Sequence, residues 1–388
     1  MTRLPAALRA PRRQSDYDAV LFWIAACLLA FGLVMVYSAS IAVAGADRQT
    51  GYHETYFLVR DAVFIAIGVA GGVVAYNVPM RLWQSLAPYA FLGGGALLII
   101  VLIPGIGRHI NGSQRWLPLF VVNLQPSELM KLFVVLYAAD YTVRKAALLD
   151  SFKHGFLPML VVMLAVGGLL LREPDFGAFV VIASIAMSIL FLGGINVKQF
   201  VGLVVLLLIG FVLLIWSSPY RMQRVIGFMN PWSDPFGSGY QLTHALIALG
   251  RGGWFGVGLG QSVEKLFYLP EAYADFLLAV IGEELGFLGV TFVIVALAWF
   301  VLRAFQVGRE AAAQDRPFSA LVAQGISVWI AVQAFINIGA NMGLVPTKGL
   351  TLPFLSFGGS GMVTNCVALG ILMRVDWETR QLGKGYST

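Results

Sequence analysis

Ten apolar stretches divide the chain, and they constrain its fold more than any other feature. Each is close to the roughly 17–25 residues with which an α-helix spans the hydrocarbon core of a bilayer. Only 12% of the 388 residues are charged, against about 25% in a soluble domain. The sequence therefore predicts an all-α polytopic membrane protein. Its ten transmembrane helices are expected near residues 19–42, 57–77, 85–104, 127–143, 155–171, 176–193, 198–216, 276–302, 318–342 and 359–374.

Positive charge predicts how these helices are oriented. Basic residues concentrate in the N-terminal tail (residues 1–18), in every second connector and in the C-terminal tail (375–388). By the positive-inside rule these segments are cytoplasmic, and so are both termini. Residues 19–374 then form one transmembrane domain. Its connector from about 217 to 275 is a large extracytoplasmic loop between the seventh and eighth helices.

A second set of basic residues lies where that rule expects few. Long outer loops escape the rule, so these side chains could simply be solvated. The alternative is a basic cavity that holds an anion, such as a diphosphate head group. The sequence alone leaves both interpretations open for Arg108, Arg115, Lys131, Arg172, Arg221, Arg224, Arg251, Lys265 and Lys348.

The fourth predicted helix carries an acid and a base. In QPSELMKL, Pro126 suits the first turn of a helix and Glu128 lies near the positive helix end. Lys131 follows three residues later, hence on the same face. A charged pair inside a membrane helix is costly unless it is buried in protein or hydrated. It therefore marks either a functional site or a structural ion pair.

Asp275 lies where the outer loop enters the eighth predicted helix. If that helix is continuous, the face below Asp275 carries three glycines: Gly282, Gly286 and Gly289. We expect this groove of small residues to admit a neighbouring helix or a lipid chain. Glu283 flanks the groove, whereas Glu284 points away and is expected to pair elsewhere.

The sequence argues against several other classes of site. GVGLG (256–260) lacks the preceding strand and the spacing of a dinucleotide-binding loop. The four histidines and two cysteines have no metal-ligand spacing, so no zinc site is expected. An inverted-repeat transporter is not favoured, because no internal repeat is evident. Nothing predicts nucleic-acid binding.

A series of motifs, in order along the chain, resembles those of a known family. They are MVYSAS, NGSQRWLPL, QPSELMKL, EPDFG, NPWSD with GYQL, YLPEAYADF followed by IGEELG, and PTKGLTLPFLSFGGSG, between residues 35 and 361. The set is similar to the SEDS family (shape, elongation, division and sporulation). PTKGLTLP is closer to the cell-division branch of that family than to its elongation branch.

The resemblance implies a peptidoglycan glycosyltransferase that polymerises lipid II at the outer face of the cell inner (cytoplasmic) membrane, at the division septum. Lipid II and undecaprenyl-diphosphate-linked glycan are the implied substrates. A class B penicillin-binding protein and other membrane proteins of the division machinery are the implied partners. No covalently bound cofactor is expected, and a divalent cation (Mg or Mn) at Asp275 is left open.

The resemblance also assigns residues. The family's essential aspartate corresponds to Asp275, and the acid and base of its fourth helix correspond to Glu128 and Lys131, which are expected to contact substrate. The motifs and the outer basic residues supply the further candidates for substrate binding: Arg115, Asp175, Arg224, Gln241, Lys265, Glu271, Lys348, Ser356 and Ser360. The chain departs from the usual motifs, which commonly have Gln, His, Thr and Ser, at Glu173, Tyr273, Ala274 and Gly361.

Asp275 is predicted to act as the general base that deprotonates an acceptor hydroxyl, while cations neutralise the leaving diphosphate. No second outer carboxylate is obviously paired with it, which favours direct displacement with inversion. The alternatives are a lipid II flippase, a coupled transporter that uses Glu128 and Glu283, a division scaffold, and an elongation-type polymerase. A flippase needs polar lining through the whole membrane depth, whereas the charges singled out here cluster at the outer end.

Overall fold

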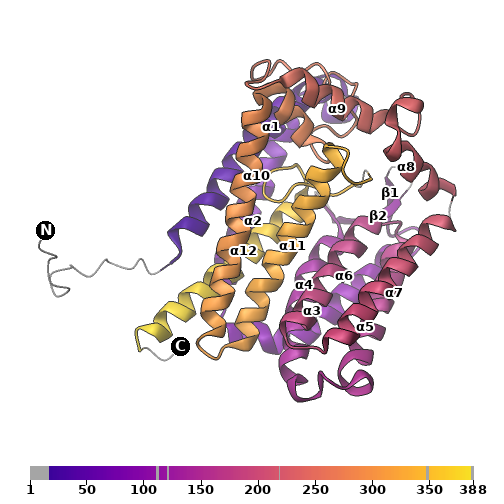
Figure 1. Cartoon of the computed structure of the whole chain (residues 1–388). Helices are drawn as coiled ribbons and strands as arrows, with labels where there is room; N and C mark the ends of the chain where they lie inside the picture. Colours follow the sequence, from indigo (N-terminus) through magenta and orange to yellow (C-terminus); the bar gives the residue numbers. More distant parts are fainter. Residues whose placement is uncertain (1–16, 111–112, 120–121, 218, 347–348, 386–388) are drawn as a thin grey trace, which may run out of the picture.

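The helices of the computed structural model follow the predicted apolar stretches. The structure describes residues 17–110, 113–119, 122–217, 219–346 and 349–385. Each predicted stretch coincides with a helix, whereas α8 and α9 lie within the predicted outer loop (Figure 1). The helices are α1 (Ala19–Ala46), α2 (Tyr56–Asn77), α3 (Met80–Val101), α4 (Pro126–Arg144), α5 (Leu157–Arg172), α6 (Phe176–Leu192), α7 (Val197–Trp216), α8 (Pro219–Met229), α9 (Tyr240–Gly252), α10 (Leu277–Ala312), α11 (Pro317–Asn341) and α12 (Gly359–Gly383). Short helical turns occupy Arg48–Thr50, Ala146–Leu148, Phe152–Phe156 and Pro231–Ser233.

Apolar length alone identifies fewer spans than the predicted ten. Among the described residues, six helices are long and apolar enough to cross a membrane: Ala19–Ala46, Tyr56–Asn77, Met80–Val101, Phe152–Arg172, Leu277–Ala312 and Pro317–Asn341. Phe176–Leu192 and Val197–Gly210 are apolar but shorter. The helices α4 and α12 are absent from both groups, and each carries several charged side chains that are buried in the protein.

The connector between α3 and α4 is folded into strands, which the all-α prediction missed. The strands β1 (Arg108–Ile110), β2 (Ser113–Leu119) and β3 (Val122–Leu124) form an antiparallel sheet in the order β1-β2-β3. The glycine, proline and asparagine content of this connector suggested only turns. The sheet matters for the site, because β2 carries Arg115 and β3 leads directly into α4.

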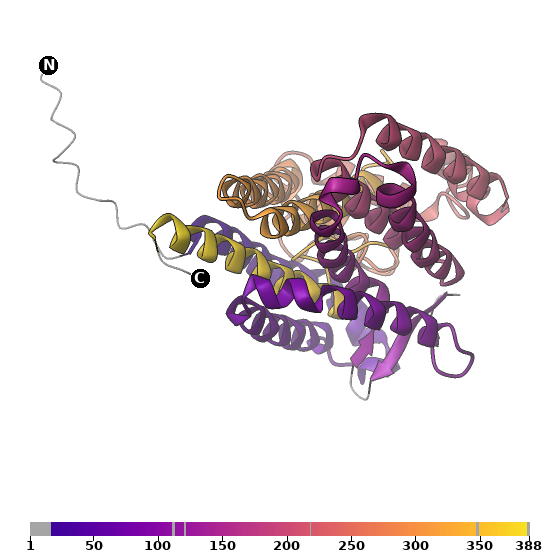
Figure 2. The same cartoon turned by 90° about the horizontal axis from the view of Figure 1, so that it is seen from below.

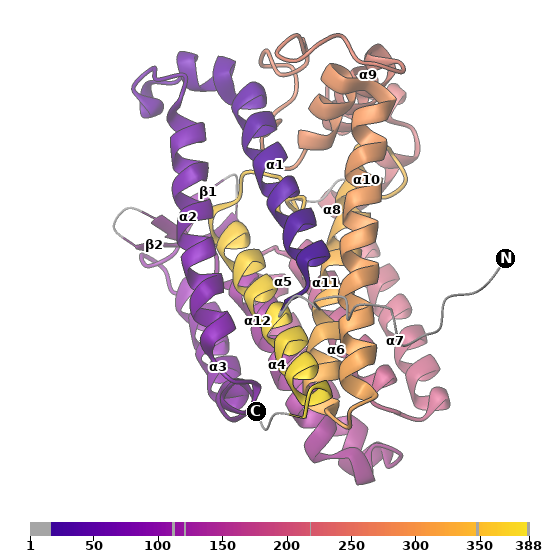
Figure 3. The same ribbon diagram turned by 90° about the vertical axis from the view of Figure 1, so that its left-hand side faces the viewer.

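Glycine allows α12 to pack closely along α2. A Cβ atom on Gly370 of α12 would lie 2.1 Å from the carbonyl oxygen of Gly72 of α2, so no larger residue fits there without a shift. Figure 3 shows α12 between α2 and α10. From below, α12 again lies between the orange pair α10–α11 and the indigo to purple helices (Figure 2). This arrangement brings the start of α12 next to α4 and α11.

Ion pairs gather the predicted cytoplasmic connectors at one end of the bundle. Asp18, before α1, pairs with Arg303 of α10 and with Arg380 of α12. Glu378 of α12 accepts from Arg316, before α11, and from the backbone N–H of Met80. We call this group the terminal cluster; it comprises Asp18, Arg303, Arg316, Arg374, Asp376, Glu378 and Arg380.

Candidate functional site

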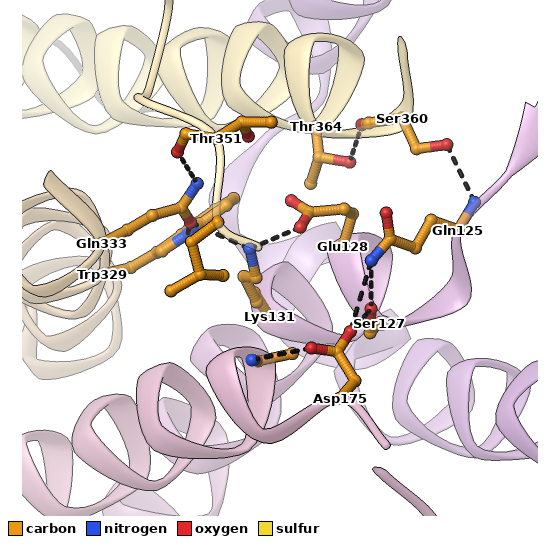
Figure 4. A network of polar contacts seen from close by, with 12 residues as sticks. Gln125, Ser127, Glu128, Lys131, Asp175, Trp329, Gln333, Thr351, Ser360 and Thr364 are labelled. Carbon is orange, nitrogen blue, oxygen red and sulfur yellow. Dashed lines mark hydrogen bonds and ion pairs between the residues drawn. The ribbon is translucent and has the colours of Figure 1, made fainter. Parts of the chain in front are cut away.

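The predicted acid–base pair of α4 forms, and it is buried. The ammonium of Lys131 donates to Glu128 Oε1 at 2.7 Å and to Gln333 Oε1 of α11 at 2.9 Å (Figure 4). Lys131 is 0% exposed and Glu128 is 6% exposed. Pro126 starts the helix two residues before Glu128, so the carboxylate lies in the first turn as predicted. The second oxygen of Glu128 has no hydrogen-bond donor among the described residues.

A second polar cluster joins the starts of α4, α6 and α12. Asp175 caps α6 by accepting from the N–H of Ala178, and it also accepts from the hydroxyl of Ser127 at 2.9 Å. The side-chain amide of Gln125 donates to Asp175 at 3.3 Å. The hydroxyl of Ser360 accepts from the backbone N–H of Gln125 at 2.9 Å (Figure 4). The predicted residues Asp175 and Ser360 are therefore tied to the segment that carries Glu128.

Asp275 lies two residues before α10 and is half-buried. Its backbone carbonyl accepts from the side-chain amides of Asn337 at 2.9 Å and Asn341 at 3.0 Å, both on α11. A Cβ atom on Gly349 would lie 3.2 Å from the Oδ2 of Asp275, so the chain after α11 approaches the carboxylate closely. The reactive candidate is therefore held between the outer loop, α11 and the segment before α12.

Tyr273, where the family motif commonly has His, packs beside this carboxylate. Its ring lies 4.4 Å from that of Phe57 and 5.7 Å from that of Phe357, measured between centroids. Its backbone carbonyl accepts from the N–H of Phe357 at 3.1 Å. Burial, followed by the nearby Glu271, raises the pKa of Tyr273 above its ordinary value of 10.0. The phenol is therefore neutral at physiological pH and serves as packing for the loop that carries Asp275.

Three amides on α11 were not among the site residues predicted from the sequence. Gln333, Asn337 and Asn341 recur at intervals of four residues and so lie on one face of the helix. All three are buried. A signal was present, because they are the polar side chains of an otherwise apolar window, WIAVQAFINIGAN. We call the group Glu128, Lys131, Asp275, Gln333, Asn337 and Asn341 the α11 network.

Arg115 contacts the chain where a diphosphate was expected. Its guanidinium donates to the backbone carbonyls of Glu173, at 3.0 Å, and Pro174, and it lies 4.0 Å from the carboxylate of Asp175. These contacts fasten β2 to the α5–α6 turn. The carboxyl group of Glu173 is fully buried, and neither of its oxygens has a hydrogen-bond partner among the described residues. Burial, with a further contribution from Asp175, raises the pKa of Glu173 to about 8 against the opposing charge of Arg115.

Lys265 is not solvated, which was one of the two interpretations left open for the outer basic residues. The side chain is only 4% exposed, and its ammonium donates to Glu284 at 2.6 Å and to Ser38 of α1 at 3.1 Å. The expectation that Glu284 pairs away from the groove is confirmed. Lys265 can be buried because Glu284 of α10 supplies the counter-charge that a buried lysine needs.

The glycine groove of α10 is also different from the prediction. Gly286 has φ 68° and ψ −160°, so the helix is interrupted there and positions on either side of it do not share a face. Protein backbone fills the groove. The N–H groups of Val257 and Gly258 donate to the carbonyls of Glu283 and Glu284 at 2.9 and 3.0 Å. At Gly282 the predicted close approach of a neighbouring helix is found, because a Cβ atom on Gly252 at the end of α9 would lie 1.8 Å from the carbonyl oxygen of Gly282. At Gly286 the loop after α9 fills the groove instead, since a Cβ atom there would lie 2.4 Å from the backbone nitrogen of Gly256.

The remaining predicted residues have different surroundings. Gln241 of α9 is partly buried, Glu271 is exposed, and the backbone carbonyl of Glu271 accepts from the N–H of Asp275 at 3.1 Å. Ser356 is buried and accepts from the N–H of Leu352 at 3.1 Å, so it holds a turn. The backbone of Arg224 belongs to α8, but its side chain lies outside the described part of the structure, as does all of Lys348.

Two hollows in the protein lie away from this site. An apolar one of about 40 Å³ lies between α5, α6 and α7, where Met163, Phe179 and Leu203 are among its walls. A polar groove of about 590 Å³ lies between α3 and α4, lined among others by Arg81 and Asp140. Neither is the basic cavity that the outer cations were predicted to form.

The chemistry available at the site centres on one carboxylate. Asp275 can accept a proton, and the buried Glu128–Lys131 pair joins α4 to Gln333 of α11. Among the described residues, no group of three or more His, Cys, Asp or Glu side chains is arranged to hold a metal ion. A divalent cation at Asp275 would therefore take most of its ligands from a bound substrate and from water.

Comparison with known proteins gives consistent matches over nearly the whole chain. A family model described as "cell cycle protein", for FtsW, RodA and SpoVE, matches residues 18–381. A probable peptidoglycan glycosyltransferase FtsW from Aromatoleum aromaticum is 64% identical, and the match covers 95% of this chain and 90% of the relative. The protein of the same name from Nitrosomonas europaea is 54% identical, with 96% of each chain covered.

Solved structures match the fold as well. One, described as "Structural coordination of polymerization and crosslinking by a peptidoglycan synthase complex", has a TM-score of 0.77 and 26% identity, and the match covers 94% of this chain and 99% of the other. The rod shape determining protein RodA of Thermus thermophilus has a TM-score of 0.65 at 24% identity, with 96% and 99% covered. The second likeness concerns the fold alone.

Proposed function

The chain belongs to the cell cycle protein family of FtsW and RodA, and we propose that it is a peptidoglycan glycosyltransferase of the FtsW type, which polymerises lipid II at the outer face of the inner membrane. The observation that carries this function is the near full-length similarity to relatives that bear that name. The same similarity favours the division enzyme over the elongation enzyme, and it supports a multi-pass protein of the inner membrane that acts at the septum. We propose ten transmembrane helices, which adds α4 and α12 to the apolar ones.

In the proposed reaction, Asp275 acts as general base. Its carboxylate accepts the proton of the acceptor sugar's hydroxyl while that oxygen forms a bond to the anomeric carbon of the donor. The bond from this carbon to the diphosphate breaks, and undecaprenyl diphosphate leaves. A positioned base typically contributes about 10²–10⁴-fold to such a step. Because attack and departure occur on opposite faces in one displacement, the anomeric configuration is inverted.

The leaving diphosphate needs cationic partners. Arg224 and Lys348 remain the proposed ones. Lys131 and Lys265 form buried ion pairs, and Arg115 donates to backbone carbonyls, so we assign these three to holding the site together. Glu128 and Asp175 join them in that role. A Mg or Mn ion is also proposed: Asp275 would be its ligand from this chain, and the ion would neutralise charge on the leaving diphosphate, although no step above depends on it.

We further propose a class B penicillin-binding protein of the FtsI type as partner, together with other membrane proteins of the division machinery. The support is the similar solved structure of a peptidoglycan synthase complex, which is described as coordinating polymerization and crosslinking. Undecaprenyl-diphosphate-linked glycan is the proposed growing substrate. A transpeptidase partner would crosslink the strands that this chain makes.

A flippase is the main alternative, and the distribution of charge does not favour it. In the described part of the chain, the buried ionisable side chains of the α11 network and of the loop–α10 contacts lie toward one end of the bundle. Those of the terminal cluster lie at the other. A path for a charged head group would need polar lining between them.

The test is a polymerisation assay with labelled lipid II on detergent-solubilised protein, with and without its penicillin-binding partner. Glycan strands should form with the wild-type chain and be lost with Asp275→Asn. Detergent removes the two leaflets, so transport alone gives no signal in this assay. Wild-type protein that makes no glycan with its partner, yet moves fluorescent lipid II between leaflets of vesicles, would overturn the enzyme in favour of the flippase.

A further inference from the structure

One face of α11 links the two ends of the candidate site. Gln333, Asn337 and Asn341 follow one another at one turn of helix, and they are 0%, 1% and 0% exposed. Each uses its side-chain amide to bind backbone groups of segments outside α11. Buried amides of this kind are stable only when their hydrogen bonds are made, so the contacts define where the neighbouring segments lie.

At one end, Gln333 contacts the ion pair. Its Oε1 accepts from Lys131 Nζ at 2.9 Å and from the indole N–H of Trp329 at 2.8 Å, and its Nε2 donates to the carbonyl of Thr351 at 2.9 Å. The opposite orientation of this amide would place its NH₂ group against the ammonium. The ion pair therefore fixes the orientation of the Gln333 amide, and this amide in turn fixes the position of the Thr351 carbonyl (Figure 4).

At the other end, the two asparagines contact Asp275. Asn337 Nδ2 donates to the carbonyl of Leu350, next to Thr351, at 2.6 Å and to the carbonyl of Asp275 at 2.9 Å. Asn341 Nδ2 donates to the same carbonyl of Asp275 at 3.0 Å. Its Oδ1 accepts from the N–H of Ala279, in the first turn of α10, at 3.1 Å. Two amides thus converge on one backbone atom of the reactive residue.

We propose that Gln333, Asn337 and Asn341 form a positioning rail that fixes Asp275 relative to the Glu128–Lys131 pair, so that a change in the pair displaces Asp275. The route runs from Lys131 through Gln333 to the segment 350–351, and from there through Asn337 to Asp275. The catalytic consequence rests on the proposed role of Asp275 as base. A displacement of about 1 Å at a reacting group can cost about 10²-fold in rate.

The position of residue 275 can be measured without any enzyme activity. In the full chain carrying Asp275→Cys, a membrane-impermeant maleimide reports how accessible position 275 is. Cys27 and Cys366 lie within α1 and α12, and the chain without the new cysteine gives their background. The rate is compared among Asn337→Leu, the double variant Glu128→Gln with Lys131→Met, and the control Ser327→Ala. Ser327 is equally buried on α11, but its hydroxyl donates only to its own helix, to the carbonyl of Ala323.

Asn337→Leu should raise the maleimide rate about five-fold or more, because local opening of the segment exposes position 275. The double variant should raise it in the same direction although it leaves no charge unpaired, and Ser327→Ala should stay within about two-fold of the parent. If Asn337→Leu does not reach the membrane, Asn341→Leu, which loses one of the two amides on Asp275, is measured instead. A double variant that reacts at the control rate would overturn the rail, and so would asparagine variants that react at that rate.

The kinetic arm uses lipid II polymerisation with Asp275 intact. Asn341→Leu should lower kcat about ten-fold or more and change KM for lipid II less than about three-fold, because a positioning residue acts on the reacting geometry. Ser327→Ala should change neither. An inactive wild-type chain would contradict the proposed enzymatic function. The maleimide rates would still test whether the three amides position residue 275. An active wild type with an unchanged kcat in Asn341→Leu would overturn the catalytic part of the rail.

Discussion

The terminal cluster and the α11 network both bury charge, but they treat it differently. In the terminal cluster each carboxylate accepts from at least one arginine. Asp18 pairs with Arg303, Asp376 with Arg380, and Glu378 with Arg316 as well as with another arginine. These contacts join α10 and α12 to the segments that precede α1 and α11. They are the arrangement expected of ion pairs that hold a bundle together.

The end of the molecule that contains the α11 network leaves carboxylate oxygens without a donor. Among the described residues these are one oxygen of Glu128 and both oxygens of Asp61 and Glu173. A buried polar atom that lacks a partner costs about 1–3 kcal/mol. Natural proteins keep such costs mainly where function needs the group. The terminal cluster also has an unpartnered buried atom, Nη1 of Arg316, so the two ends differ in their carboxylates. This difference in the carboxylates indicates that one end is built for stability and the other for chemistry.

The largest expected effect is on the rate of polymerisation, and it compares one aspartate from each end, Asp275 and Asp18. Asp275→Asn should lower polymerisation by about 10²–10⁴-fold, because the carboxamide removes the base and keeps the shape. Asp18→Asn should leave the rate per folded molecule unchanged, because Asp18 only caps α1 and pairs with Arg303 and Arg380. Asn is also a good helix cap, so its cost is the lost charge. Initial rates on equal amounts of folded protein measure both.

The control for this pair is the melting temperature in detergent. Asp275→Asn should melt like the wild type, and Asp18→Asn should melt lower. Asp275→Asn with substantial residual polymerisation would contradict the general-base assignment. A large loss of rate in folded Asp18→Asn would break the contrast itself.

The second prediction compares the two ends by removing one cation from each. Lys131→Met leaves Glu128 as an uncompensated buried charge and should lower the free energy of unfolding by about 3–5 kcal/mol. Arg316→Met should cost only about 1–2 kcal/mol, because Glu378 keeps its bonds from Arg374 and from the N–H of Met80. Denaturation in a single detergent measures the difference.

A double-mutant cycle completes that test. Adding Glu128→Gln to Lys131→Met should recover most of the lost stability, because it removes the stranded charge. Activity need not return, since Gln333 loses the ammonium that it accepts from in either case. Purely additive losses would show that the pair does not act as a unit.

The sequence predicted what depends on neighbours along the chain. The apolar stretches became helices, and Glu128 and Lys131 paired because a spacing of three residues is enough to bring them together. The position of Asp275 before α10 was also predictable. These features need only helical periodicity and the cost of burying charge, which are both properties of local sequence.

What the sequence could not predict depends on contacts distant in the chain. Lys265 looked like a free outer cation because its partners Glu284 and Ser38 are 19 and 227 residues away. The helical wheel around Asp275 failed because Gly286 interrupts α10, and a wheel assumes a continuous helix. The partners of Asn337 could not be predicted either, because they are distant in the chain. A polar residue in an apolar helix does not by itself indicate which segment it contacts.

The third prediction uses pH to probe the unpartnered carboxyl of Glu173. Its pKa is about 8 in the folded chain and 4.5 as the ordinary value, so between these values the folded state binds more protons. The contribution of Glu173 to the free energy of unfolding should therefore be fully present below about pH 4.5. It should fall as the pH rises to about 8 and level off above that pH. Glu173→Gln should remove this slope and be more stable than the wild type at pH 8 by about 2–4 kcal/mol, somewhat less than the full pKa shift implies.

Thermal unfolding of both chains between pH 5 and 9 measures the slope. The matched control is Asp175→Asn, which disturbs the same turn but removes a carboxylate that has three hydrogen-bond donors. That variant should be less stable at every pH. A wild-type chain whose stability does not change between pH 5 and 8 would contradict the buried, protonated state of Glu173.

The smallest expected effect comes from a substitution that supplies a hydrogen-bond donor to Glu128. A Cβ atom on Gly361 would lie 3.1 Å from the unpartnered Oε2 of Glu128 and 3.5 Å from the hydroxyl oxygen of Thr351. Gly361→Ser, which restores the residue common in the family, places a hydroxyl within reach of that oxygen. Against this, the carboxylate must shift by a few tenths of an ångström. The new hydrogen bond and the better helix propensity of Ser should outweigh the cost of this shift. We expect a net gain of about 1 kcal/mol in the free energy of unfolding.

Gly361→Ala separates the two contributions, because it adds the Cβ atom and helix propensity without the hydroxyl. If the end of the molecule near Asp275 truly lacks a donor at Glu128, the serine variant should be more stable than the alanine variant by about 1 kcal/mol or more. The gain should vanish in the Glu128→Gln background, since the charge-assisted part of the bond is then lost. Equal stability of the two variants would show that Oε2 is already satisfied, and the contrast with the terminal cluster would then rest on Asp61 and Glu173 alone.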